Sequence, residues 1–156
     1  MSIEDDIALL QQVPLLGVLG REALRILAIG AESRTVQPGA VLVSAGELAD
    51  SAYVVETGSF HMETPGGRDG IARRGALLGE FALLIETRWP FTATARELAS
   101  VLRIARPLFR KMLDGYPEVA ERLRRQMLAD CEQLAEEINA VRAALAKNMP
   151  PATPRR

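Results

Sequence analysis

The residues best suited to chemistry lie in a short run near the middle of the chain. Residues 79–85 read GEFALLI, which is rich in helix-forming side chains and lacks the alternation of a strand. A helix beginning near Gly79 would aim the backbone N–H groups of Glu80, Phe81 and Ala82 at a ligand, and its dipole would favour an anion. Gly79 would allow close approach of the backbone. Glu80 either stabilises the helix N-terminus or accepts a hydrogen bond from a hydroxyl.

Other arrangements of reactive residues are absent from the sequence. His61 and Cys131 are the only histidine and cysteine, and neither has a second ligand of either type nearby. No serine lies in a nucleophile-elbow pattern, and no glycine-rich loop ends in Gly-Lys-Ser or Gly-Lys-Thr. We therefore expect no catalytic residue, no metal site and no enzymatic activity.

Length and composition predict one globular domain. The chain has 156 residues, of which 48% are hydrophobic and 25% charged, with a formal net charge of -1. A single cysteine excludes an internal disulfide and favours a reducing, cytoplasmic location. The apolar runs are shorter than the roughly 18–20 residues of a membrane span. The acidic start, MSIEDDIALL, is unlike a secretory signal.

The elements that must position the run at 79–85 follow from periodicity and turn signals. The first 30 residues have helical apolar spacing, whereas residues 34–106 contain short apolar or alternating segments separated by glycine-containing turns. We expect an α+β fold, an antiparallel, jelly-roll-like β-roll with a short helix embedded at 79–85. The predicted strands are Thr35–Val36, Val41–Val43, Ala52–Val55, Ser59–Glu63, Gly75–Leu78, Ala93–Ala95 and Val101–Ala105.

The C-terminal third is predicted to be helical. Helices are expected at Leu108–Leu113 and from Glu118 to about Asn148, and the prolines after it predict a disordered tail at 149–156. Apolar residues in the longer helix recur at spacings of three and four, which is typical of a packing seam. Up to residue 130 we expect this helix to pack on its own domain, so that residues 1–130 form one unit. Residues 131–148 carry a narrower stripe, and we expect a homodimer seam there. The stripe consists of Leu134, Ile138, Val141 and Leu145.

Several segments resemble one known family. Residues 36–62 read VQPGAVLVSAGELADSAYVVETGSFHM, residues 75–84 read GALLGEFALL, and residues 92–95 read TATA. In this order they are similar to the β-roll, phosphate-binding cassette and following strand of cyclic nucleotide-binding domains. That family includes the catabolite activator protein and the regulatory subunits of cyclic AMP-dependent protein kinase. The flanks at 13–16 and 106–118 are similar to the family's helical elements, so the resemblance covers about residues 10–130.

The resemblance implies a ligand and a mode of signalling. A cyclic nucleotide, cAMP or cGMP, would lie against the helix that begins at Gly79, and the ribose 2′-OH would bond to Glu80. Movement of the C-terminal helix would then signal to an effector protein. No cofactor is implied. The DNA-reading domain of the transcription factors in this family has no counterpart in residues 149–156, so DNA binding is not expected.

One position departs from the family pattern. The family's arginine, which pairs with the cyclic phosphate, aligns with Trp89 by direct counting from Gly79. With two inserted residues it aligns with Phe91, and we prefer this alignment because Thr92 then matches the usual serine. Arg88 is the nearest arginine, but an odd shift along an extended segment turns a side chain to the opposite face. A lost charge-assisted bond costs roughly 1.5–3 kcal/mol.

Three interpretations of this departure remain open. In the first, Trp89 or Phe91 stacks on a purine while Arg88 supplies the charge. In the second, the pocket takes a different, less anionic ligand. In the third, an aromatic side chain fills the pocket and leaves a ligand-free dimeric scaffold. The candidate ligand-binding residues are Gly79, Glu80, Phe81, Ala82, Arg88, Trp89, Phe91 and Thr92.

Overall fold

The N-terminal segment is helical, as predicted. The computed structural model describes residues 2–148, without the side chains at 131, 133, 134, 137, 138, 141 and 145–148. Helix α1 spans Ile3–Gln12, the short helix η1 spans Leu16–Leu19 and helix α2 spans Arg21–Gly30. Ser2 begins α1 with a capping box, since its side chain accepts from the backbone of Asp5 while the Asp5 carboxylate accepts from the Ser2 N–H.

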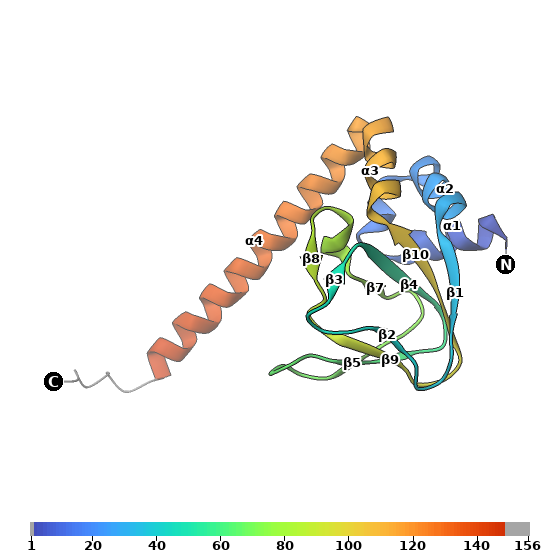
Figure 1. The fold of residues 1–156 in the computed structure, drawn as a ribbon. Helices are drawn as coiled ribbons and strands as arrows, with labels where there is room; N and C mark the ends of the chain where they lie inside the picture. Colours follow the sequence, from blue (N-terminus) through green and yellow to red (C-terminus); the bar gives the residue numbers. More distant parts are fainter. Residues whose placement is uncertain (1, 149–156) are drawn as a thin grey trace.

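Within residues 2–148, ten short strands form an antiparallel β-roll, which confirms the predicted fold class (Figure 1). One sheet has the order β1-β10-β4-β7, a second has the order β2-β9-β5-β6, and β3 pairs with β8 alone. The strands are β1 (Glu32–Val36), β2 (Val41–Val43), β3 (Leu48–Ala49), β4 (Ser51–Thr57), β5 (Phe60–Glu63), β6 (Gly70–Ala72), β7 (Leu77–Leu78), β8 (Thr87–Arg88), β9 (Thr92–Ala95) and β10 (Ala99–Ala105).

Strand β4 contributes side chains to two hydrophobic cores, one packed against the helices and one inside the roll. Its residues 51–56 are all buried, which is why this segment reads as an apolar run rather than an alternation. Ala52 and Val54 pack with the helices, whereas Tyr53 and Val55 face the interior of the roll. Because successive side chains point to opposite faces of a strand, β4 joins the helical layer to the roll.

The sequence-based prediction missed β3, β6 and β8. These strands have only two or three residues, too few to show a period of two, and β3 and β8 pair only with each other. The embedded helix is present as η2 (Glu80–Leu83), a single turn of 3-10 helix. It lies between β7 and β8.

Two helices end the described part of the chain. Helix α3 spans Arg106–Gly115 and α4 spans Pro117–Asn148. Val119 and Leu123 bury their side chains in the helical core, and Met127 packs against it. Farther along, α4 extends away from the roll (Figure 1). The predicted seam residues Leu134, Ile138, Val141 and Leu145 have side chains outside the described set, and the predicted tail at 149–156 lies outside the described residues altogether.

Within residues 2–148, none of the helices combines the length and the apolar character needed to cross a membrane.

Candidate functional site

The turn that contains η2, residues 79–85, is named here the cassette turn. Gly79 precedes η2 with φ 82°, a left-handed conformation that favours glycine. A Cβ atom at Gly79 would meet the indole ring of Trp89 and would lie 3.2 Å from the carbonyl oxygen of Ser51. The missing side chain of Gly79 therefore makes room for Trp89 in this structure.

Trp89 is part of the core of the roll. Its side chain is only 6% exposed, and its ring centroid lies 5.9 Å from that of Tyr53 and 5.8 Å from that of Phe91. Backbone hydrogen bonds on both sides hold the residue, because its N–H donates to Glu47 O at 2.9 Å and its carbonyl accepts from Gly46 N at 2.8 Å. The indole thus packs directly against the backbone at which an anion was expected.

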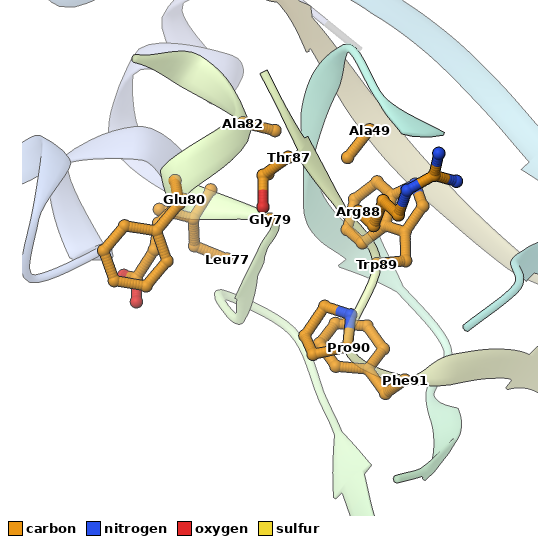
Figure 2. A pocket seen from close by; sticks show the side chains of 11 residues that line it. Ala49, Leu77, Gly79, Glu80, Ala82, Thr87, Arg88, Trp89, Pro90 and Phe91 are labelled. Carbon is orange, nitrogen blue, oxygen red and sulfur yellow. The ribbon is translucent and has the colours of Figure 1, made fainter. Parts of the chain in front are cut away.

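Arg88 points the other way. It pairs with Leu48 across the β3–β8 ladder, is exposed, and donates from Nη1 to the carbonyl oxygen of Gly46 at 2.7 Å. Figure 2 places its guanidinium and the Glu80 carboxylate on opposite sides of the site. The buried Trp89 and the exposed Arg88 follow the alternation of an extended segment, with no bulge that would turn Arg88 inward.

The next two residues differ in their surroundings. Phe91 is half-buried beside Trp89. Thr92 begins β9, and its hydroxyl oxygen accepts a hydrogen bond from Ala45 N at 3.0 Å. Thr92 therefore fixes the loop between β2 and β3, which is the same loop that bonds to Arg88 and Trp89.

A cavity of about 340 Å³ lies between the cassette turn and strand β8 (Figure 2). Seven of the eight candidate residues line it, Thr92 being the exception, and Phe81 is 52% exposed beside it. Sequence reasoning missed four further lining residues, none of which carries a charge. The complete lining is Ala49, Leu77, Gly79, Glu80, Phe81, Ala82, Thr87, Arg88, Trp89, Pro90 and Phe91.

Two arginines of α3 hold the cassette turn from outside the cavity. Arg106 donates from Nε to Ala82 O at 2.7 Å and from Nη2 to Ala49 O at 2.6 Å. Arg110 donates from Nη2 to Leu84 O at 3.1 Å. These contacts join positions 24 and more apart in the chain, so no local spacing could have indicated them.

Helix α4 also reaches the cassette turn. Leu84 lies beside a hollow of about 320 Å³ whose other lining residues come from α4. They are Leu123, Arg124, Met127 and Leu128. The cassette turn is thus hydrogen-bonded to α3 and shares a mostly apolar hollow with α4.

The described residues offer little for metal or acid–base chemistry. Among them, no group of three or more histidine, cysteine or acidic side chains is placed to hold a metal ion. Glu56 on β4 is 1% exposed, and burial raises the pKa of its carboxyl above the ordinary value, although a hydrogen bond from Ser33 opposes this. Glu56 does not line the cavity, so it belongs to the framework of the roll.

Comparison with known proteins decides the family. The sequence profile described as "Cyclic nucleotide-binding domain" matches residues 33–116, more than half of the chain. This chain belongs to the cyclic nucleotide-binding domain family. The family is one of regulatory ligand-binding domains, and the predicted resemblance is confirmed.

A curated relative supports the same assignment. The cAMP-dependent protein kinase regulatory subunit of Yarrowia lipolytica is 32% identical over 107 residues, which are 67% of this chain and 28% of that protein. The chain spans less than a third of the length of the curated relatives it matches.

Solved structures share the fold. A cyclic nucleotide-binding-like protein from Brucella abortus is 35% identical with a TM-score of 0.63, covering 70% of this chain and 98% of that one. The N-terminal domain of a transcriptional regulator from Streptomyces coelicolor has a TM-score of 0.75 at 24% identity, covering 83% of this chain and 94% of that one. This second likeness concerns the fold alone.

Proposed function

We propose that this chain is a non-enzymatic regulatory module that couples its cassette turn to its C-terminal helices without a tightly held cyclic nucleotide. The observation that carries the proposal is the packing of the buried Trp89 indole against Gly79, with Arg88 bonded outward to Gly46. A cyclic phosphate in the family's position would compete with the indole for space and would find no inward cation.

The energetic argument favours an empty phosphate position. A charge-assisted hydrogen bond contributes roughly 1.5–3 kcal/mol, so loss of one or two such bonds lowers affinity by at least about tenfold. The only arginine lining the cavity bonds to a backbone carbonyl, and the only acid lining it, Glu80, would repel a nearby phosphate. The charged groups that line the cavity therefore do not suit an anion.

The output in this proposal passes through α3 and α4. Arg106 and Arg110 bond to carbonyls of the cassette turn, so displacement of that turn would alter the seating of α3. Leu84 of the same turn lines a hollow together with residues of α4. We propose that α4 presents residues 131–148 to a second copy of the chain, which makes the module a dimeric scaffold for an effector protein.

A second candidate is a cyclic nucleotide sensor with an unusual site. The cavity of about 340 Å³ beside Glu80 favours it, because the family relationship would place the ribose hydroxyl on that carboxylate. In this candidate Phe91 or Trp89 stacks on the purine and Arg88 turns inward, which requires it to release Gly46.

Calorimetric titration with cAMP and cGMP separates the two candidates. The nucleotide-free protein should give no heat up to millimolar ligand, and its melting temperature should not shift. Micromolar binding that Glu80→Ala removes, with little change in melting temperature, would overturn the proposal in favour of the sensor.

Restoring the arginine provides the positive control. Phe91→Arg follows the preferred alignment and changes a half-buried residue, whereas Trp89→Arg follows the other alignment and changes a buried one. We expect Trp89→Arg, which removes the indole and adds the cation, to gain more nucleotide binding than Phe91→Arg, which leaves the indole against Gly79, and Glu80→Ala should weaken the binding that is gained. If neither arginine variant binds although both remain folded, the missing arginine is not what excludes the ligand.

Self-association needs a separate experiment. Ile138→Lys should convert a dimer to a monomer in sedimentation equilibrium, because a charge would lie in the apolar stripe. Ala143→Lys, at an exposed position of the same helix, is the matched control and should leave the dimer intact. A wild-type protein that is monomeric at high micromolar concentration would contradict this part of the proposal.

A further inference from the structure

A further hollow lies at the start of α3, apart from the cavity beside Trp89 and the hollow beside Leu84. It has a volume of about 390 Å³ and shares no lining residue with that cavity. Three arginines and one aspartate supply its charged groups. The lining residues are Asp50, Arg103, Ala105, Arg106, Pro107 and Arg110.

The aspartate at this hollow is engaged with one of the arginines. Arg103 donates from Nη2 to Asp50 at 3.5 Å and from Nη1 to Glu32 at 3.3 Å. The hydrogen bond from the Ser51 hydroxyl, with a smaller contribution from Arg103, lowers the pKa of Asp50 below its ordinary value. The charge of Arg103 is therefore balanced within the protein.

Arg106 and Arg110 are not balanced in this way. Their hydrogen-bond acceptors are the backbone carbonyls of Ala82, Ala49 and Leu84, which carry no net charge. Among the side chains that the structure describes, no carboxylate forms an ion pair with either arginine. Arg106 is half-buried, so its charge is less screened by salt than that of a fully exposed residue.

We propose that this hollow binds a phosphate monoester. Such a group carries a charge of about −1.5 to −2 near neutral pH, which matches the two arginines that lack an acidic partner. Guanidinium groups present planar forks that bond to phosphate oxygens in pairs. Each guanidinium has several N–H donors, and Arg106 uses only two of them and Arg110 one. A single carboxylate would neutralise only half of this charge.

Occupancy of the hollow would affect the cassette turn. The same guanidinium groups that would hold the phosphate already bond to Ala82 O and Leu84 O. A phosphate bound there would fix both side chains and therefore the turn that they hold. An anion bound on the α3 side would therefore regulate the cassette turn, whether or not the cavity beside Trp89 binds a ligand.

The test is a titration at constant ionic strength, followed by NMR chemical shifts of the full chain. The probes are inorganic phosphate and a phosphoserine peptide, with the unphosphorylated peptide as the reference. We expect both phosphate probes to shift resonances around residues 103–110, and tighter binding of the phosphopeptide would identify a protein side chain as the source. No saturable shift with either probe up to tens of millimolar would overturn the proposal.

Three substitutions make the test specific. Arg110→Gln removes one unbalanced charge at an exposed position and should weaken phosphate binding by about tenfold, the effect of one charge-assisted bond. Asp50→Asn should strengthen binding several-fold, a gain that loss of folding could not imitate. Arg125→Gln, at an exposed arginine of α4, should have no effect. Equal weakening by Arg110→Gln and Arg125→Gln would show general charge attraction instead of a site.

Discussion

The two sides of the cassette turn differ in the side chains that contact its backbone. On the cavity side, the turn meets the neutral indole of Trp89, which is 6% exposed. On the α3 side, its carbonyl oxygens accept hydrogen bonds from Arg106 and Arg110. The arginines that contact this turn thus lie behind it, and the residue at the ligand-facing side is apolar.

This difference follows from the burial of position 89, the partial exposure of position 106 and the exposure of position 110. A cation at position 89 would be buried in the core of the roll, and burial of an unpaired charge is costly. At positions 106 and 110 a guanidinium remains partly solvated and satisfies carbonyl oxygens at the same time. The comparison therefore indicates that the cavity side contributes packing, and that the α3 side contributes polar connections.

Truncation of Trp89 tests the packing side and should give the largest effect. Trp89→Ala should lower the free energy of unfolding by about 3–5 kcal/mol, as large-to-small changes of buried aromatics do. Urea denaturation followed by circular dichroism measures this. Phe91→Ala, at a half-buried position in the same aromatic group, should cost less than half as much. If Trp89→Ala cost below about 1 kcal/mol, the indole would not be a core residue and the cavity side would be open to ligand.

Substitution of Gly79 tests whether the indole and the cassette turn are in direct contact. Gly79→Ala should cost about 2–4 kcal/mol, since the new Cβ combines left-handed strain with collision against Trp89. Gly75→Ala is the matched control, because Gly75 has φ 88° but no atom within 4 Å of its Cβ position. It should show only the strain, about 1 kcal/mol. In a Trp89→Leu background the excess cost at Gly79 should shrink, and an unchanged excess would locate the collision elsewhere.

Loss of a cassette hydrogen bond tests the polar side. Arg106→Gln should cost about 1.5–3 kcal/mol, because the carbonyls of Ala82 and Ala49 would lose a charged donor in a partly buried place. Arg88→Gln, which removes one bond from an exposed arginine to Gly46 O, should cost well under 1 kcal/mol. Thermal and urea unfolding of the two variants measure the difference. Equal costs would mean that the two sides of the turn do not differ in this respect.

Much of this arrangement was predictable from the sequence. The strands Val41–Val43 and Thr92–Ala95 and the helices of both ends follow from apolar periodicity and turn residues, which are local properties. The local rule of alternation places Arg88 and Trp89 on opposite faces, although the sequence left open whether Arg88 supplies the charge to a ligand. Seven of the eight candidate site residues line one cavity because neighbours in sequence share it.

The rest depends on contacts between distant segments. The pairing of β3 with β8 involves two residues on each strand, too few for a periodic signal. Arg106 contacts the cassette turn only because the fold brings the start of α3, which follows β9 and β10 in the chain, next to that turn. The sequence likewise left three interpretations of Trp89 open, since a buried and a ligand-facing indole have the same local pattern.

Glu56 is a buried acidic residue of the roll, and its substitution measures what a buried charge costs there. We expect this substitution to change the free energy of unfolding least. Its side chain is buried, and Oε2 has no hydrogen-bond partner within the described residues. Burial raises the pKa of Glu56 above the ordinary value of 4.5, so the native state holds this proton more tightly than the unfolded chain does. Stability from this group is therefore fully present below about pH 4.5 and is lost as pH rises through the native pKa.

Glu56→Gln should then stabilise the protein at pH 7, by less than about 1 kcal/mol, and the gain should vanish near pH 4. Urea unfolding at the two pH values measures this. Ser33→Ala, which removes the hydroxyl donor to Oε1, should be more destabilising at pH 7 than at pH 4. A gain from Glu56→Gln that is independent of pH would show that the carboxyl is not a buried charge. Glu56 would then no longer support the argument that a buried cation at position 89 is costly.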